Sequence, residues 1–118
     1  MSEYLRKRPS GPTFSQKGLA GYQLPILDSS FEAYEVYVEQ GHDNYIVSKR
    51  ITHTYFVIEG SGIFNIDGEK IEVEKEDLIE VPPQVEYTYT GKMRLLLFMT
   101  PPWFEGNEIV TKPNPDVK

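Results

Sequence analysis

The chain has 118 residues, a formal net charge of -6 and a pI of about 4.9. This length suits one domain with a core large enough to fold alone. An acidic chain lacks the basic face with which nucleic-acid-binding proteins neutralise phosphates, so we expect no nucleic-acid partner. Cysteine is absent, which excludes disulfides and thiolate metal ligands.

No apolar run approaches the roughly 20 residues that a membrane span needs, so we expect no membrane partner. The amino terminus carries charge but has no apolar segment of the kind found in secretory signals. These features predict a cytoplasmic protein.

Residues 1–20 contain several glycines and prolines and no helical period. They predict an extended N-terminal arm, which in small barrels often lies across a partner subunit. We therefore expect a homodimer. Residues 21–104 form the expected barrel domain, and residues 105–118 form a C-terminal tail.

Apolar and polar residues alternate with period two along much of residues 21–104, which favours half-buried strands. The expected strands cover residues 22–27, 34–39, 45–50, 53–58, 63–66, 70–74, 78–81, 85–90 and 93–99. Turns are expected at residues 59–62, 67–68, 82–83 and 91–92, where glycine, proline and polar residues gather. About eight to ten short strands without a helix indicate an antiparallel sandwich or closed barrel.

Residues 54–62 form an aromatic and β-branched run that ends at glycines, and residues 97–103 end in Pro-Pro-Trp. Gly41 and Gly60 fall where the first motif of the cupin superfamily has its glycines, and Pro82 falls at a proline of the second motif. The region from Gly41 to Trp103 thus resembles a small single-domain cupin. The resemblance implies an all-β antiparallel barrel of the jelly-roll, or double-stranded β-helix, type.

Many cupins hold a metal through three histidines and a glutamate. The resemblance places Val47, Lys49, His53 and Tyr87 at those positions, and only His53 is a natural ligand. We therefore expect no metal site and no cofactor. An alternative is a divalent metal in a remodelled site that uses His53, His42 and a carboxylate.

If the family geometry holds, Lys49, His53 and Tyr87 point into one barrel and are candidate catalytic residues. His53 would act as a base and Tyr87 or Lys49 as an acid, because histidine titrates near neutral pH and a desolvated lysine can lose its proton. A register shift of one residue would instead turn Lys49 outward.

Alternation adds Tyr45, Tyr55 and Tyr89 to the barrel wall as candidate ligand-binding residues. Tyrosines suit sugar-like or aromatic ligands because they combine an apolar face with a hydroxyl group. Inward tyrosines also commonly fill a barrel core, and a lone inward histidine is commonly a hydrogen-bonded core residue.

Three functions remain open at this stage, and the sequence does not decide whether the chain is an enzyme. The first is a small-molecule-binding cupin that lacks the usual metal site. The second is a metal-independent isomerase or epimerase of sugars such as nucleotide sugars, in which His53 and Tyr87 act. The third is a metal-dependent cupin enzyme with rearranged ligands.

Overall fold

The computed structural model describes residues 2–118, and these contain nine β-strands and no helix. The described residues accordingly offer no helix that could cross a membrane. The strands are β1 (Phe14–Gln16), β2 (Leu19–Gln23), β3 (Glu32–Val38), β4 (Asn44–Ser48), β5 (Thr52–Ile66), β6 (Glu69–Glu74), β7 (Leu78–Val81), β8 (Glu86–Thr100) and β9 (Glu108–Pro113).

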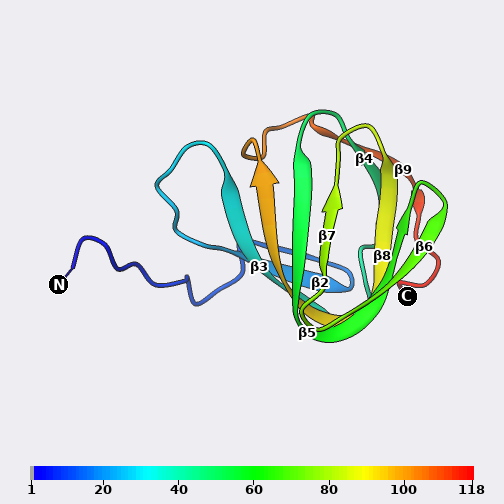
Figure 1. The fold of residues 1–118 in the computed structure, drawn as a ribbon, viewed down its shortest axis with the longest axis horizontal. Helices are drawn as coiled ribbons and strands as arrows, with labels where there is room; N and C mark the ends of the chain where they lie inside the picture. Colours follow the sequence, from blue (N-terminus) through cyan, green and yellow to red (C-terminus); the bar gives the residue numbers. More distant parts are fainter. Residues whose placement is uncertain (1) are drawn as a thin grey trace.

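Two long strands, β5 and β8, form the central pair of the barrel (Figure 1). They pair antiparallel over almost their whole length, from Thr52↔Thr100 to Ile66↔Tyr87. The first part of β8 also pairs with β4 and its last part with β3, while β5 pairs with β7 and then β6. Because each long strand changes its outer partner midway, the sheet curls, and the predicted all-β antiparallel barrel is confirmed.

The turns expected at residues 59–62 and 91–92 are wrong. Both glycine-containing segments lie inside the long strands, where Gly62 and Gly91 are paired and the register shifts between Val57 and Glu59. A Cβ on Gly91 would lie 2.6 Å from the Cα of Gly62. The glycines therefore mark a bend where two backbones approach closely, which is an alternative meaning of glycine in a strand.

The turn expected at residues 67–68 is confirmed. Asp67 and Gly68 both have positive φ, at 51° and 82°, and they join β5 to β6 in a hairpin. This conformation is typical of a two-residue turn, for which Asp-Gly is a preferred sequence.

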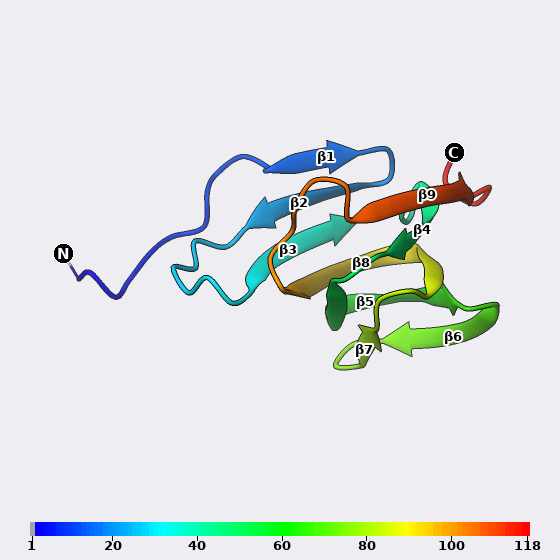
Figure 2. The ribbon, with the colours of Figure 1, turned by 90° about the horizontal axis from the view of Figure 1, so that it is seen from above.

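Both ends of the chain contain more regular structure than the expected arm and tail. β1 lies within residues 1–20, and β2 begins at Leu19 instead of residue 22; together they extend the sheet beyond β3. β9 lies within residues 105–118 and pairs with β4. The first residues still run away from the barrel (Figures 1 and 2). The expected homodimer stays a prediction.

The core lies inside the curled sheet, where alternate residues of β3, β5 and β8 meet. Its fully or nearly fully buried members include Val36, Val57, Phe64, Val81 and Leu95. Tyrosines of the same core cluster and two histidines line a cavity.

Candidate active site

A cavity of about 470 Å³ is lined by residues of several strands and of the loops beside them. Its wall combines aromatic rings, aliphatic side chains and a few polar groups. The lining residues are Thr13, Phe14, Gln16, Leu19, Tyr34, Val36, His42, Ile46, His53, Tyr55, Tyr87, Tyr89, Leu97, Met99, Trp103 and Glu108. These lining residues include one acidic side chain, Glu108, and no lysine or arginine. The described wall therefore has no permanent cation.

Tyr55, Tyr87 and Tyr89 form the aromatic wall of the cavity and come from neighbouring strands β5 and β8. The hydroxyl oxygens of Tyr55 and Tyr87 lie 2.6 Å apart, which makes a strong buried hydrogen bond. The rings of Tyr55 and Tyr89 meet edge to face with centroids 5.4 Å apart. Burial raises the pKa of all three hydroxyls, so they stay protonated and can donate hydrogen bonds.

His42 lies in the loop between β3 and β4 and lines the cavity beside Tyr89, with ring centroids 5.9 Å apart. Its Nδ1 lies 2.8 Å from the carbonyl oxygen of Asn44, to which it donates in one neutral tautomer. The main-chain N–H of Asn44 lies 3.2 Å from Nδ1 and could donate to it only in the other tautomer, so the shorter contact favours the first. The Nε2 atom is then an acceptor free for a ligand. Burial lowers the pKa of His42, although the hydrogen bond to Asn44 opposes the shift. The imidazole is therefore neutral at physiological pH.

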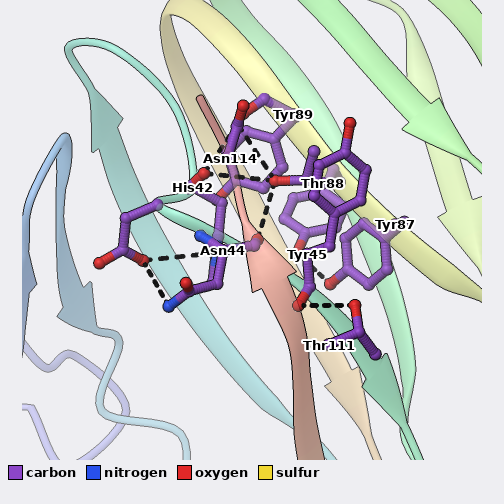
Figure 3. Close-up of polar contacts among 10 residues, drawn as sticks. His42, Asn44, Tyr45, Tyr87, Thr88, Tyr89, Thr111 and Asn114 are labelled. Atoms are coloured by element: carbon purple, nitrogen blue, oxygen red, sulfur yellow. Dashed lines mark hydrogen bonds and ion pairs between the residues drawn. The ribbon is translucent and has the colours of Figure 1, made fainter. Parts of the chain in front are cut away.

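The backbone of the His42 loop is held from two sides (Figure 3). Asn114, which follows β9, donates from Nδ2 to the carbonyl oxygen of His42 at 2.9 Å. Thr88 on β8 donates from Oγ1 to the carbonyl oxygen of Asn44 at 2.9 Å. The main-chain N–H of His42 donates to the carbonyl of Tyr89 at 3.0 Å. These contacts fix the direction in which the imidazole enters the cavity.

Gly41 makes the close approach of this loop possible. Its φ is +146°, and a Cβ there would lie 2.3 Å from the carbonyl oxygen of Tyr89. Only glycine accommodates that backbone and that distance. The glycine that carried part of the family resemblance therefore places the neighbouring histidine against β8.

His53 and Glu108 form a pair across the cavity wall. His53 on β5 is 2% exposed, and its Nε2 lies 3.4 Å from Oε2 of Glu108 on β9. The hydrogen bond from His53 lowers the pKa of Glu108, against the opposing effect of burial. Within residues 2–118, Nδ1 of His53 is buried and has no hydrogen-bond partner. A proton on Nε2 can be donated to Glu108, whereas a proton on Nδ1 would be a buried N–H group without a partner.

Of the six predicted site residues, four line the cavity and two do not. His53, Tyr55, Tyr87 and Tyr89 are brought together, as expected from alternation along β5 and β8. Their roles in catalysis or binding remain predictions.

The expected positions of Lys49 and Tyr45 in the cavity are wrong. The inward residues of β4 are Ile46 and Ser48, which are 3% and 1% exposed. The odd-numbered positions therefore face away from the cavity, as in the register alternative. Lys49 is exposed, and the hydroxyl of Tyr45 accepts a hydrogen bond from Asn65 instead of facing the cavity.

Two residues of the site escaped prediction from sequence. The sequence indicates His42 only as a possible ligand in a remodelled metal site, and its position next to the motif glycine Gly41 is the signal that could have placed it at the cavity. Glu108 lies in the region expected to be a tail, and no local pattern around it indicates that β9 returns to pair with β4.

The metal that many cupins hold does not fit this donor set. Val47 has no ligating atom and Lys49 is exposed, so two of the four motif positions offer nothing inside the barrel. Among residues 2–118, no group of three or more histidine, aspartate or glutamate side chains is arranged to hold a metal ion.

Known sequences give a limited comparison. No family model matches the chain. An uncharacterised protein of Methanocaldococcus jannaschii is 34% identical over 61 residues, which are 48% of this chain and 49% of that protein. The chain therefore matches about half the length of this curated relative.

Solved structures are similar over a larger share of the chain. The RmlC-like cupin of Shewanella frigidimarina has a TM-score of 0.63 at 20% identity and covers 81% of this chain and 95% of its own. The chain has the cupin fold. It is also similar to the nucleoside dehydratase Pac13, with 28% identity, a TM-score of 0.82 and coverage of 93% of this chain and 88% of the other.

Further solved structures show Streptomyces PAC13 with uridine in the variants H42Q, Y55F and Y89F. The Y55F structure matches this cupin with 26% identity and a TM-score of 0.84, covering 98% of this chain and 96% of the other. The similarity thus extends over nearly the whole of both chains.

Proposed function

We propose that this cupin is a metal-independent dehydratase that acts on a free nucleoside or a close derivative. The observation that carries the proposal is the neutral imidazole of His42, whose Nε2 is left free at the wall of a tyrosine-lined cavity. The residue types and numbers changed in the uridine-bound PAC13 variants coincide with His42, Tyr55 and Tyr89 of this chain. All three line the cavity.

Elimination of water requires a base that removes a proton from one carbon and a donor that assists the hydroxyl leaving the next carbon. His42 is the better candidate, because its Nε2 has no hydrogen-bond partner within residues 2–118 and its lowered pKa keeps the imidazole neutral, and so able to accept a proton, at physiological pH. Nε2 of His53 is paired with Glu108, and its Nδ1 is buried away from a ligand. We therefore assign proton removal to His42. His53 instead holds the carboxylate of Glu108 in place.

The tyrosine hydroxyls supply the hydrogen-bond donors. Their raised pKa values keep them protonated, so they can stabilise an oxygen on which negative charge develops. The departing hydroxide takes up the proton that His42 removed, so that water leaves and the imidazole returns to its neutral form. An imidazole of lowered pKa is too weak to remove a proton from an unactivated carbon. The substrate must therefore carry a carbonyl group beside the carbon that loses the proton.

The charge of the cavity favours a nucleoside over a nucleotide or a nucleotide sugar. A diphosphate is usually bound by arginine, lysine or a helix N-terminus, and the described lining residues include no arginine or lysine while the described chain has no helix. The ionised Glu108 would also repel a phosphate. The nucleotide-sugar epimerase alternative therefore has less support, although it remains a prediction.

The test is turnover with purified protein. Ribonucleosides oxidised to a carbonyl at one sugar carbon are incubated with the wild type and with His42→Gln, and the loss of one water is followed by mass spectrometry. We expect dehydration by the wild type alone. Absence of dehydration across the panel, or equal rates in both proteins, would refute the proposal.

A further inference from the structure

Glu108 lines the cavity, and only one of its two carboxylate oxygens has a partner within residues 2–118. Oε2 lies 3.4 Å from Nε2 of His53, and the side chain is 33% exposed and lines the cavity. No hydrogen bond to Oε1 is found within residues 2–118. One oxygen atom is therefore held by the protein, and the other is free to meet a ligand.

The surroundings keep this group charged and oriented. Its partner His53 is 2% exposed and packs against Tyr55, with the rings nearly parallel at 16° and centroids 6.3 Å apart. His53 thus has little freedom to release the carboxylate. An ionised carboxylate only accepts hydrogen bonds, so the part of a ligand that meets it must present donors.

In the proposed ligand, the neighbouring hydroxyls of the ribose are the natural donors. Two hydroxyls on adjacent carbons can reach the oxygen atoms of one carboxylate, and an acidic side chain recognises ribose hydroxyls in dinucleotide-binding folds as well. We propose that Glu108, held by His53, binds the vicinal diol of the sugar and makes this cupin selective for ribonucleosides over deoxyribonucleosides. This inference rests on the proposed nucleoside ligand.

The experiment measures binding by calorimetry with uridine, 2′-deoxyuridine and 3′-deoxyuridine as probes. The wild type is compared with Glu108→Gln, which keeps the shape of the side chain and removes its charge. Glu86→Gln is the matched control, because Glu86 is bonded to Thr111 at the surface of the sheet and does not line the cavity. Thermal unfolding verifies that each variant is folded.

We expect the wild type and Glu86→Gln to bind uridine about 10- to 100-fold more tightly than either deoxynucleoside, as for one lost hydrogen bond to a charged group. In Glu108→Gln this difference should fall to a few-fold. Equal binding of the three probes by the wild type would overturn the inference even if Glu108→Gln failed to fold. An unchanged difference in folded Glu108→Gln would overturn it as well.

Turnover measured in parallel separates this inference from the proposed function. Selective binding without dehydration would retain the diol site and reject the dehydratase. Dehydration without selectivity would do the reverse. If no nucleoside binds to the wild type, the ligand class and the diol site are both rejected.

Discussion

The side-chain amide of Asn114 is bonded to the main-chain carbonyl of His42 at 2.9 Å, across 72 positions of the sequence. Asn114 is 3% exposed and also lies 3.4 Å from the carbonyl of Tyr89. It therefore links the segment after β9 to the loop that carries the proposed base. This makes Asn114 a positioning residue that acts through His42.

Replacing Asn114 with aspartate should lower turnover while the protein remains folded. Asn114→Asp keeps the acceptor that binds the N–H of Asp116 and removes the amide donors. We expect kcat to fall about 10- to 100-fold with a smaller change in KM. A displaced His42 is poorly aligned with the proton that it removes, while most contacts that bind the substrate remain. Asn65→Asp is the matched control, since Asn65 contacts Tyr45 outside the cavity. An equal loss in both variants would argue against a specific role.

His42→Gln should remove proton abstraction but keep the cavity intact. A positioned general base typically contributes about 10²- to 10⁴-fold to the rate, so we expect a fall in kcat of that size. Binding of uridine should change only a few-fold in calorimetry. His53→Gln serves as the comparison: if His53 were the base, its variant would show the larger loss of kcat and His42→Gln would remain active.

The pH profile of kcat/KM should report the lowered pKa of His42. Only the neutral imidazole accepts a proton, so activity should decline as the pH falls through this pKa, which lies below the ordinary value of 6.5. Toward alkaline pH the profile should stay level, because the pKa values of Tyr55, Tyr87 and Tyr89 are raised above 10. An acid limb with its midpoint above pH 6.5 would contradict this assignment, provided that circular dichroism shows a folded protein there.

The hydroxyl pair of Tyr55 and Tyr87 should show coupling in a double-mutant cycle. Each single change to phenylalanine leaves the other hydroxyl buried without its partner, which costs about 1–3 kcal/mol of unfolding free energy. The double variant should cost less than the sum of the two single changes, because no unpaired hydroxyl of this pair remains. Urea denaturation of the four proteins measures this difference, and simple additivity would show that the pair contributes no interaction of its own.

Removal of metal should leave turnover unchanged. Val47 and Lys49 offer no ligand inside the barrel, so the chemistry is assigned to His42 and the tyrosines. The check is elemental analysis of the purified protein, together with rates before and after dialysis against a chelator. One metal per chain, with activity lost on dialysis and restored by that metal, would reject metal independence.

The barrel could be predicted from sequence because most of its strands show an alternation of apolar and polar residues that is visible locally. Alternation along residues 53–58 and 85–90 correctly placed His53, Tyr55, Tyr87 and Tyr89 on the inner face. The same local rule failed at β4, where a strand of five residues gave too little pattern to fix which face turns inward. The expectation for Lys49 and Tyr45 therefore placed their side chains on the wrong face of the sheet.

The remainder of the site depends on contacts that no local pattern contains. His42 faces the cavity because a loop is held by Thr88 and Asn114, which lie far away in sequence. Glu108 reaches His53 because β9 pairs with β4. The glycines at residues 60–62 and 91 resemble turns in the sequence, because glycine serves both in turns and where two paired strands approach closely.

β9 and Asn114 both follow residue 107, so they are synthesised after the other parts of the site. A nascent chain that has emerged only to that point already contains the long strands and the aromatic wall. It lacks the carboxylate opposite His53 and the amide that fixes the His42 loop. On refolding, recovery of uridine binding should therefore require the docking of the segment after residue 107, in addition to the strand pairing that gives the barrel its circular dichroism. The barrel strands alone are then not sufficient to bind uridine, because the segment after residue 107 completes the site.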